Sequence, residues 1–247
     1  MKIFRKILYI ILILIIINIK FTYAGDSDDN YGIGLSMDKT TFVNSDAIPH
    51  YTIGANYLMA GKYEQAIDEF NKAISIDPSY ALAYYGRGQA NIALRKYNDA
   101  LADFNKAIEL DPNYDKNYIG RGEAYINLGD VDKALADYSK AIELNPNSVV
   151  NYLKRAAVYT LLGRTDEAIS DYNNALKLDP KNSDIYMARG AVYMSINEFN
   201  KAIDDFTKAI ELDPENIYVY YLRSMAYQAI GETELAQEDY DRFYDMQ

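Results

Sequence analysis

A segment of 34 residues recurs along the chain, and this period constrains the fold more than any other feature. It is clearest in residues 81–114, which read ALAYYGRGQANIALRKYNDALADFNKAIELDPNY. The same residue types return in the frames 47–80, 81–114, 115–148, 149–182, 183–216 and, truncated, 217–247. A fixed period of this length indicates stacked structural repeats. Since such an array needs roughly three repeats, six frames are enough to share a continuous core.

Each frame divides into two amphipathic halves. The first half has large residues at frame positions 4 and 11 and a small one at position 8. The second half has alanine, an aromatic residue and alanine at positions 20, 24 and 27, as in Ala100, Phe104 and Ala107. Spacings of 3, 4 and 7 place each set on one face of a helix. We therefore predict two helices in each frame, separated from the next frame by a proline at position 32.

Position 15, between the two halves, is predicted to be a tight turn. It is occupied by Gly61, Gly129, Gly163 and Gly231 in four frames. Glycine can supply a positive φ at a helix end. Arg95 and Asn197 replace it in the second and fifth frames.

The small, alanine, aromatic, alanine and proline residues at positions 8, 20, 24, 27 and 32 closely resemble the tetratricopeptide repeat (TPR) family. The resemblance covers about four fifths of the chain. It implies an all-α fold, a right-handed α-solenoid of antiparallel helix pairs (a TPR superhelix), with five full 34-residue repeats plus a truncated sixth. The sixth frame departs from the pattern, with Phe243 at position 27 and no proline. Its second half is acidic, so we expect the partial repeat 217–247 to cap the array.

Residues 1–24 have the pattern of a secretory signal peptide. Lys2, Arg5 and Lys6 precede an apolar run over residues 7–17, and Ala24 precedes a polar stretch. The run is shorter than the roughly 20 apolar residues of a membrane-spanning helix. We therefore predict cleavage after Ala24, with an uncleaved N-terminal anchor as the alternative. Either arrangement predicts that the repeats are exported, to the periplasm or the extracellular space.

Residues 25–46 are interpreted as a polar, acidic linker. The spacing of Asp26, Asp28 and Asn30 is similar to that of a calcium loop, but Tyr31 and Met37 occupy the positions that require glycine and glutamate. The chain has no cysteine, which excludes disulfides, thiolate metal sites and a thiol nucleophile. We expect neither a metal nor a cofactor.

The charge of the chain also limits its partners. The formal charge is −11, and residues 1–24 hold four basic residues and no acid, so cleavage would leave about −15. Such an acidic body repels nucleic acid and anionic lipid. We expect no nucleic acid or small-molecule substrate as a ligand, and contact with a membrane only if residues 1–24 stay attached. A basic or neutral apolar protein partner fits better.

Positions 7 and 23 carry a recurring pair of opposite charges. The arginines are Arg87, Arg121, Arg155, Arg189 and Arg223, and the aspartates are Asp103, Asp137, Asp171, Asp205 and Asp239. The first frame departs at both positions together, with Ile53 and Glu69. We predict a partly buried Arg–Asp ladder, paired within a frame or between adjacent frames, because an arginine fork matches a carboxylate. The alternative is a track of arginines that binds an anionic ligand.

The TPR resemblance assigns a binding groove to positions 2, 5, 9, 12 and 13 of the first helices. The candidate groove residues are Tyr51, Tyr85, Gln89, Ile119, Glu123, Leu153, Met187, Met194, Tyr221 and Met225. No frame has the lysine and asparagine with which chaperone-binding relatives hold a terminal carboxylate. An apolar wall with tyrosine and methionine suits an extended peptide or an amphipathic helix. Alternatively, some of these side chains pack against adjacent frames.

These observations favour a non-enzymatic module that binds a protein or peptide segment. No Ser/His/Asp arrangement and no phosphate-binding loop is present. The one histidine, His50, takes a position where other frames have tyrosine, so we interpret it as a packing residue rather than a base. The alternative function is a structural subunit of a larger cell-envelope assembly, which contacts partners through its ends or associates with itself.

Overall fold

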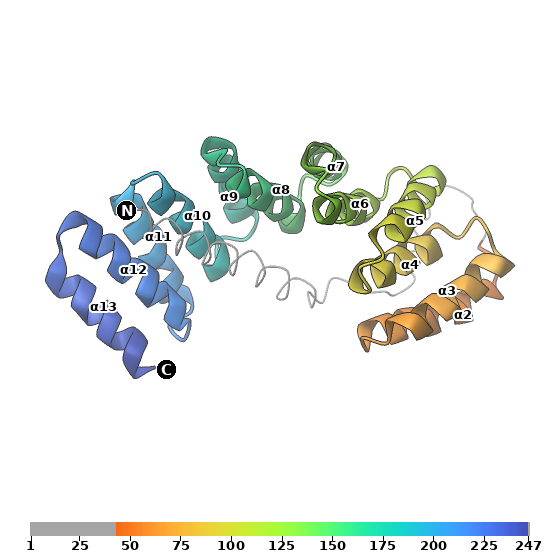
Figure 1. The fold of residues 1–247 in the computed structure, drawn as a ribbon, viewed down its shortest axis with the longest axis horizontal. Helices are drawn as coiled ribbons and strands as arrows, with labels where there is room; N and C mark the ends of the chain where they lie inside the picture. The colour runs from red at the N-terminus through yellow and green to blue at the C-terminus, as the bar shows by residue number, and fades with distance from the viewer. Residues whose placement is uncertain (1–42, 247) are drawn as a thin grey trace. The chain divides into compact units, whose positions relative to one another are not determined.

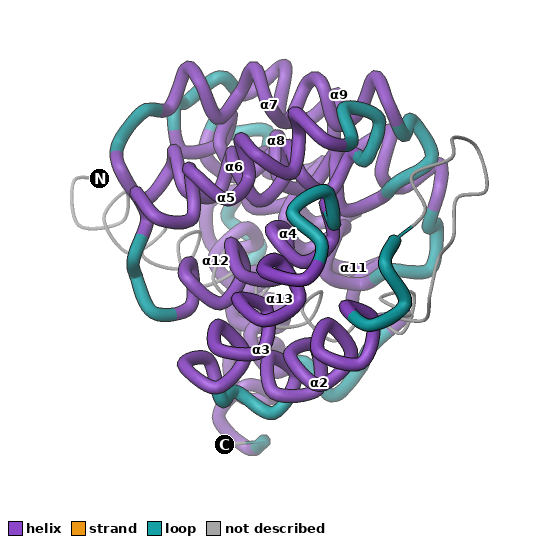
Figure 2. The backbone as a smooth tube through the Cα atoms, turned by 90° about the vertical axis from the view of Figure 1, so that its right-hand side faces the viewer, coloured by secondary structure: helices purple, strands orange, loops and turns teal. Residues whose placement is uncertain are grey.

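The structure, a computed structural model, describes residues 43–246, which form twelve helices and no strand (Figures 1 and 2). The predicted signal peptide and most of the predicted linker lie outside the described residues. The prediction of an all-α fold is confirmed. No helix between residues 43 and 246 is both long and apolar enough to cross a membrane.

The described helices belong to two compact units, divided between Pro146 and Asn147. The N-terminal unit contains three helix pairs: α2 (Ala47–Met59) with α3 (Tyr63–Ile76), α4 (Ala81–Ala93) with α5 (Tyr97–Leu110), and α6 (Asp115–Leu128) with α7 (Val131–Leu144). Helix α3 also packs on α4, and α5 packs on α6. The first helices α2, α4 and α6 contact one another in sequence, and form the first-helix layer of this unit.

The C-terminal unit repeats this arrangement. Its pairs are α8 (Val149–Leu161) with α9 (Thr165–Leu178), α10 (Ser183–Ser195) with α11 (Phe199–Leu212), and α12 (Ile217–Ile230) with α13 (Thr233–Asp245). Helix α9 packs on α10, and α11 packs on α12. Consecutive pairs therefore pack within each unit as in an α-solenoid.

In the five full frames, the core of the helix pair is built on the aromatic residue at position 24. In the first frame Ala66, Phe70 and Ala73 are almost completely buried. A Cβ atom added to Gly86 of α4 would lie 2.5 Å from Cζ of Phe70, and one added to Gly54 of α2 would lie 2.9 Å from its Cδ1. The glycines are therefore needed because two first helices approach the same ring closely.

The turn between paired helices has one backbone conformation in all six frames. The residue at position 15 has a positive φ throughout, between 60° and 88°. This set includes Arg95 (φ 60°) and Asn197 (φ 63°) as well as the four glycines. The prediction of a positive φ is thus confirmed, and the turn geometry holds even where a side chain makes it unfavourable.

Replacing Arg95 by glycine should stabilise the N-terminal unit. The left-handed conformation costs a residue with a side chain about 1–2 kcal/mol, and the greater freedom of glycine when unfolded offsets roughly 0.5–1 kcal/mol of the gain. We expect Arg95→Gly to raise the free energy of unfolding by about 0.5–1 kcal/mol, measured by urea denaturation. Asn197→Gly should raise the free energy of unfolding by less, since asparagine tolerates the left-handed conformation. Destabilisation by Arg95→Gly would contradict the explanation.

Candidate functional site

The structure brings each predicted arginine together with the predicted aspartate of the same frame. In the fifth frame Nε and Nη2 of Arg189 donate to the two carboxylate oxygens of Asp205, at 2.9 and 2.6 Å. The same two-point contact occurs between Arg121 and Asp137 and between Arg223 and Asp239. Arg87 with Asp103 and Arg155 with Asp171 complete the set. The ladder therefore joins the two helices of each pair.

The ladder lies at the edge of the core rather than in solvent. The aspartate side chains are 3–8% exposed and the arginine side chains 17–25%. Hydrogen bonding to Asp205 raises the pKa of Arg189, because the ion pair favours the charged guanidinium. Burial raises the pKa of the Asp205 carboxyl, and its bonds to Arg189 offset part of that rise. Each carboxylate thus depends on its arginine for compensation.

A third contact of the arginines was missed by sequence reasoning. Nη1 of Arg189 donates to Oδ1 of Asn173, at position 25 of the preceding frame. Arg87 and Arg121 make the same contact with Asn71 and Asn105, and Arg223 makes it with Thr207. Position 25 reads Asn, Asn, Ser, Asn and Thr in the five full frames, and this run of short polar residues is the signal that could have revealed it.

The first frame has a different polar contact in place of the ladder. Nδ1 of His50 lies 2.7 Å from Oε2 of Glu69, and Nζ of Lys72 donates to the other oxygen at 2.6 Å. Hydrogen bonds from Lys72 and then His50 lower the pKa of Glu69. The interpretation of His50 as a packing residue was incomplete, because its ring also contacts a carboxylate.

The engagement of the arginines favours a structural ladder over an anion-binding track. All five guanidinium groups bind the aspartate of their own frame. At least four of them also reach the preceding frame, so an incoming anion would have to compete with existing bonds. Among residues 43–246, no group of three or more histidines and carboxylates is placed to hold a metal ion.

The candidate groove residues divide into buried and accessible sets. Six are buried and belong to the cores, so the expectation of an open apolar wall needs correction at Tyr51, Ile119, Leu153, Met187, Met194 and Met225. Leu153 and Met187, for example, are 2% and 5% exposed within the core of the C-terminal unit. Their size and apolar character are used to pack neighbouring frames, as the alternative interpretation held.

Four candidates remain partly accessible: Tyr85, Gln89, Glu123 and Tyr221. Three of them lie on α4 and α6, which adjoin in the first-helix layer of the N-terminal unit. Tyr85 packs edge-on against Phe104 and Tyr114, with ring centroids 6.0 and 5.5 Å apart, and this fixes the orientation of its ring. Ile92 and Ile126, at position 12 of the same helices, are also half-buried. We call Tyr85, Gln89, Ile92, Glu123 and Ile126 the α4–α6 surface.

Removing one partner of an Arg–Asp pair should lower the free energy of unfolding strongly, and the effects of removing both partners should not be additive. Arg189→Ala leaves Asp205 buried without its counter-ion, and we expect a loss of about 3 kcal/mol in the free energy of unfolding. Asn173→Ala removes only the contact between frames and should cost about 1 kcal/mol. The double variant Arg189→Ala/Asp205→Ala should lose less than the two single variants summed, in urea denaturation. A loss below about 0.5 kcal/mol for Arg189→Ala would indicate a solvated, dispensable pair.

Comparison with solved structures gives matches to proteins of similar fold. MamA is similar with a TM-score of 0.62 and 23% identity, over 67% of this chain and 91% of that one. YrrB, described as a TPR protein with an unusual peptide-binding site, matches with a TM-score of 0.58 and 26% identity, over 70% and 90% of the two chains. A thermophilic TPR protein of Thermus thermophilus, TTC0263, matches with a TM-score of 0.57 and 26% identity, over 74% and 98%.

Family comparison agrees with the structural matches. Sequence models described as tetratricopeptide repeat match residues 81–114, 116–148 and 183–216, and also 138–170 and 206–238. A further model, described as TPR repeat, matches residues 54–94 and 157–197. Comparison with curated protein sequences gives no significant match. The matched segments extend from residue 54 to residue 238, and the chain belongs to the tetratricopeptide repeat family.

Proposed function

We propose that this chain is a non-enzymatic protein–protein interaction module that binds a peptide or helical segment of another protein on the α4–α6 surface. Tetratricopeptide repeat proteins are interaction modules, and YrrB is described as having a peptide-binding site. The observation that carries the proposal is the position of Tyr85, Gln89 and Glu123. They remain partly accessible at family groove positions, where most of the other candidates are buried.

The chemistry of this surface suits a segment with mixed apolar and polar side chains. Tyr85 offers an aromatic face held in place by Phe104 and Tyr114. The amide of Gln89 and the carboxylate of Glu123 supply hydrogen-bonding groups, and Ile92 and Ile126 supply apolar area beside them. Glu123 and the acidic charge of the chain favour a neutral or basic ligand.

Peptides selected from a random phage-displayed library on the purified chain provide the test. We expect Gln89→Ala/Glu123→Ala to weaken binding of the selected peptides at least about tenfold in fluorescence anisotropy, because both polar contacts are lost. Tyr85→Ala should do the same, with its thermal melting measured to confirm that it folds. The matched control, Tyr240→Ala/Tyr244→Ala on α13, should bind as the wild type does. Unchanged binding in both α4–α6 variants would show that the surface is not the site.

We also propose that the module works outside the cytoplasm, as the basic and apolar pattern of residues 1–24 suggests. The chain recovered from its natural compartment should begin at Gly25. Intact-mass measurement and N-terminal sequencing check this, and a substitution such as Ala24→Phe should block processing by removing the small residue. Recovery of the uncleaved chain from the membrane fraction would favour the anchor, and recovery from the cytoplasm would overturn the proposal.

Assembly through the ends of the array is the second candidate function. The exposed large side chains of α13, among them Leu235, Tyr240 and Tyr244, favour it.

A further inference from the structure

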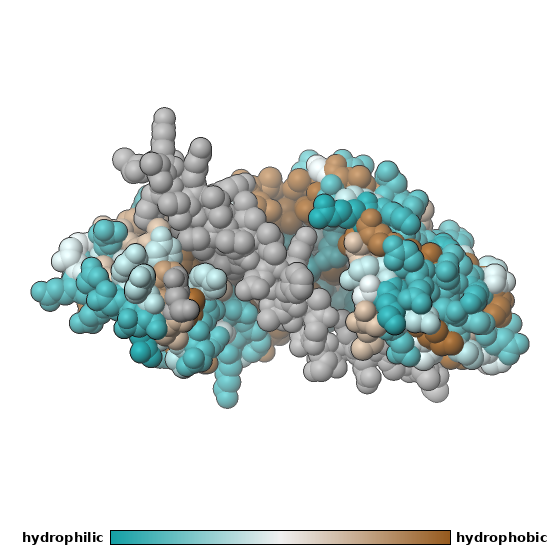
Figure 3. Space-filling model, turned by 60° about the horizontal axis from the view of Figure 1, so that its bottom comes forward, coloured by the Kyte–Doolittle hydropathy of each residue, from teal (hydrophilic) through white to brown (hydrophobic). Residues whose placement is uncertain are grey.

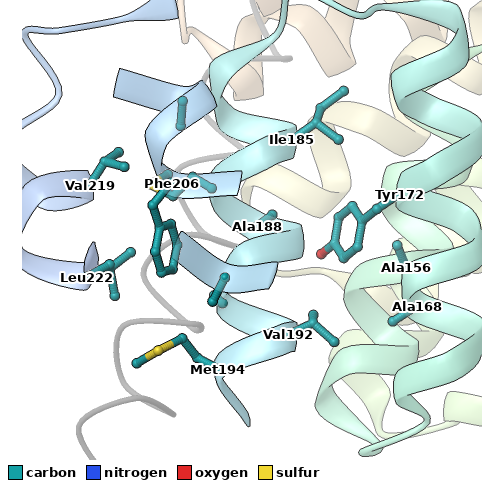
Figure 4. Close-up of a cluster of buried hydrophobic side chains, with 14 of the residues drawn as sticks. Ala156, Ala168, Tyr172, Ile185, Ala188, Val192, Met194, Phe206, Val219 and Leu222 are labelled. Carbon is teal, nitrogen blue, oxygen red and sulfur yellow. The ribbon is translucent and has the colours of Figure 1, made fainter. Parts of the chain in front are cut away.

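Within each unit, the second helix of a pair buries its position-24 aromatic residue under the first helix of the next pair. Phe70 of α3 lies under Gly86 of α4, and Phe104 of α5 lies under Gly120 of α6. Figure 4 shows the same arrangement in the C-terminal unit, where Tyr172 points toward Ala188 of α10 and Phe206 lies beside Leu222 of α12. These four aromatic rings are at most 1% exposed. A small or apolar residue of a helix therefore covers each of them.

Helix α13 has the same kind of face, and no described helix packs over it. Positions 17, 21, 24 and 28 of this helix, which we call the α13 face, are Thr233, Gln237, Tyr240 and Tyr244. Tyr240 takes the place of Phe70 and Phe206 but is 46% exposed, and Tyr244 is 69% exposed. Ala236, at a position where alanine is otherwise completely buried, is only half-buried.

Helix α2, at the start of the array, has polar residues at two positions of its uncovered face. The face of α2 that corresponds to the buried face of later first helices has exposed Thr52 and Asn56. Their counterparts in α4 are Gly86 and Ala90, which are buried. Two positions of this end are therefore polar, although Ile53 and Met59 of the same helix are 42% and 69% exposed. On α13, Gln237 replaces the apolar residue of position 21, while Tyr240 and Tyr244 remain as two large exposed aromatic side chains.

The charges around the α13 face indicate the character of a partner. The helix has five carboxylates and one arginine. Asp239 is neutralised by Arg223, which leaves Glu234, Glu238, Asp241 and Asp245 on its outer side. A second copy packed α13 against α13 would bring these like charges together, and α2 has no lysine or arginine with which to attract α13. On the described surface in view, Figure 3 shows separate hydrophobic areas among mainly hydrophilic side chains.

We propose that the α13 face binds a basic amphipathic helix of another protein, in the place that a first helix takes over each earlier second helix. A glycine or alanine of the partner helix crosses Tyr240, as Gly86 crosses Phe70. Lysines or arginines at its edge meet Asp241 and Asp245. The two tyrosine hydroxyls stay at the rim, where they can remain hydrated. This surface is separate from the α4–α6 surface and does not depend on it.

The test uses a fluorescent 18-residue helical peptide with alanines along one face and lysines at its edges. Its matched control has glutamates in place of the lysines. In fluorescence anisotropy, Tyr240→Ala/Tyr244→Ala should weaken binding of the lysine peptide at least about tenfold. This variant keeps every charge of the chain, so the loss separates docking on the face from general attraction to an acidic protein. Asp241→Lys/Asp245→Lys should weaken binding similarly, and Tyr218→Ala, which removes a tyrosine 61% exposed on α12, should have no effect.

Three results would overturn the proposal. The first is that the lysine peptide binds the wild type and Tyr240→Ala/Tyr244→Ala with equal affinity. The second is that the lysine and glutamate peptides bind the wild type with equal affinity. The third is that the wild type forms a dimer in sedimentation and Tyr240→Ala/Tyr244→Ala does not. The last would assign the face to a second copy of this chain. Gln89→Ala/Glu123→Ala should bind the lysine peptide normally, so failure here is distinguishable from failure of the α4–α6 surface.

Discussion

The structure depends on one steric arrangement, an aromatic ring held between small residues of two helices. A Cβ atom added to Gly54 in its own pair or to Gly86 in the next would lie under 3.0 Å from the Phe70 ring, and the same holds for Phe104 at Gly88 and Gly120. Each ring thus buries its area twice, within a pair and between pairs, and this makes neighbouring repeats cooperative. Since close packing leaves no room for even a methyl group, this contact also fixes how far apart the helices lie.

The Arg–Asp ladder fixes the register of helices whose aromatic packing alone would not fix it. Apolar rings fix a distance but tolerate sliding, whereas a guanidinium that satisfies Asp205 and Asn173 together allows only one register. The ladder lies beside the aromatic row, partly screened from water, where breaking it is costly. It is therefore better understood as a device for uniform stacking than as a source of net stability.

The helix pairs could be predicted because the period of the sequence reports helical faces directly. The Arg–Asp pairing was also predictable, since Ile53 and Glu69 depart together in the first frame. Position 25 was missed because a short polar residue on a helix resembles a solvated one, and its role depends on the spacing between frames. Accessibility at position 5 could not be predicted either. Leu153 is sealed in a core and Tyr85 is not, although both occupy the same place in the repeat.

This last difference explains where function can reside in an array of near-identical units. A repeat interior must satisfy neighbours on both sides, so its side chains are committed to packing, as Leu153 and Met187 are. A binding surface is available only where that requirement is relaxed, either at groove positions where neighbours leave a side chain accessible or at an end with one neighbour fewer. Tyr85 and Glu123 meet the first condition, and Tyr240 and Tyr244 meet the second. The two proposed surfaces thus lie where the packing of the repeat is relaxed, while the buried side chains of the repeat hold the helices in place.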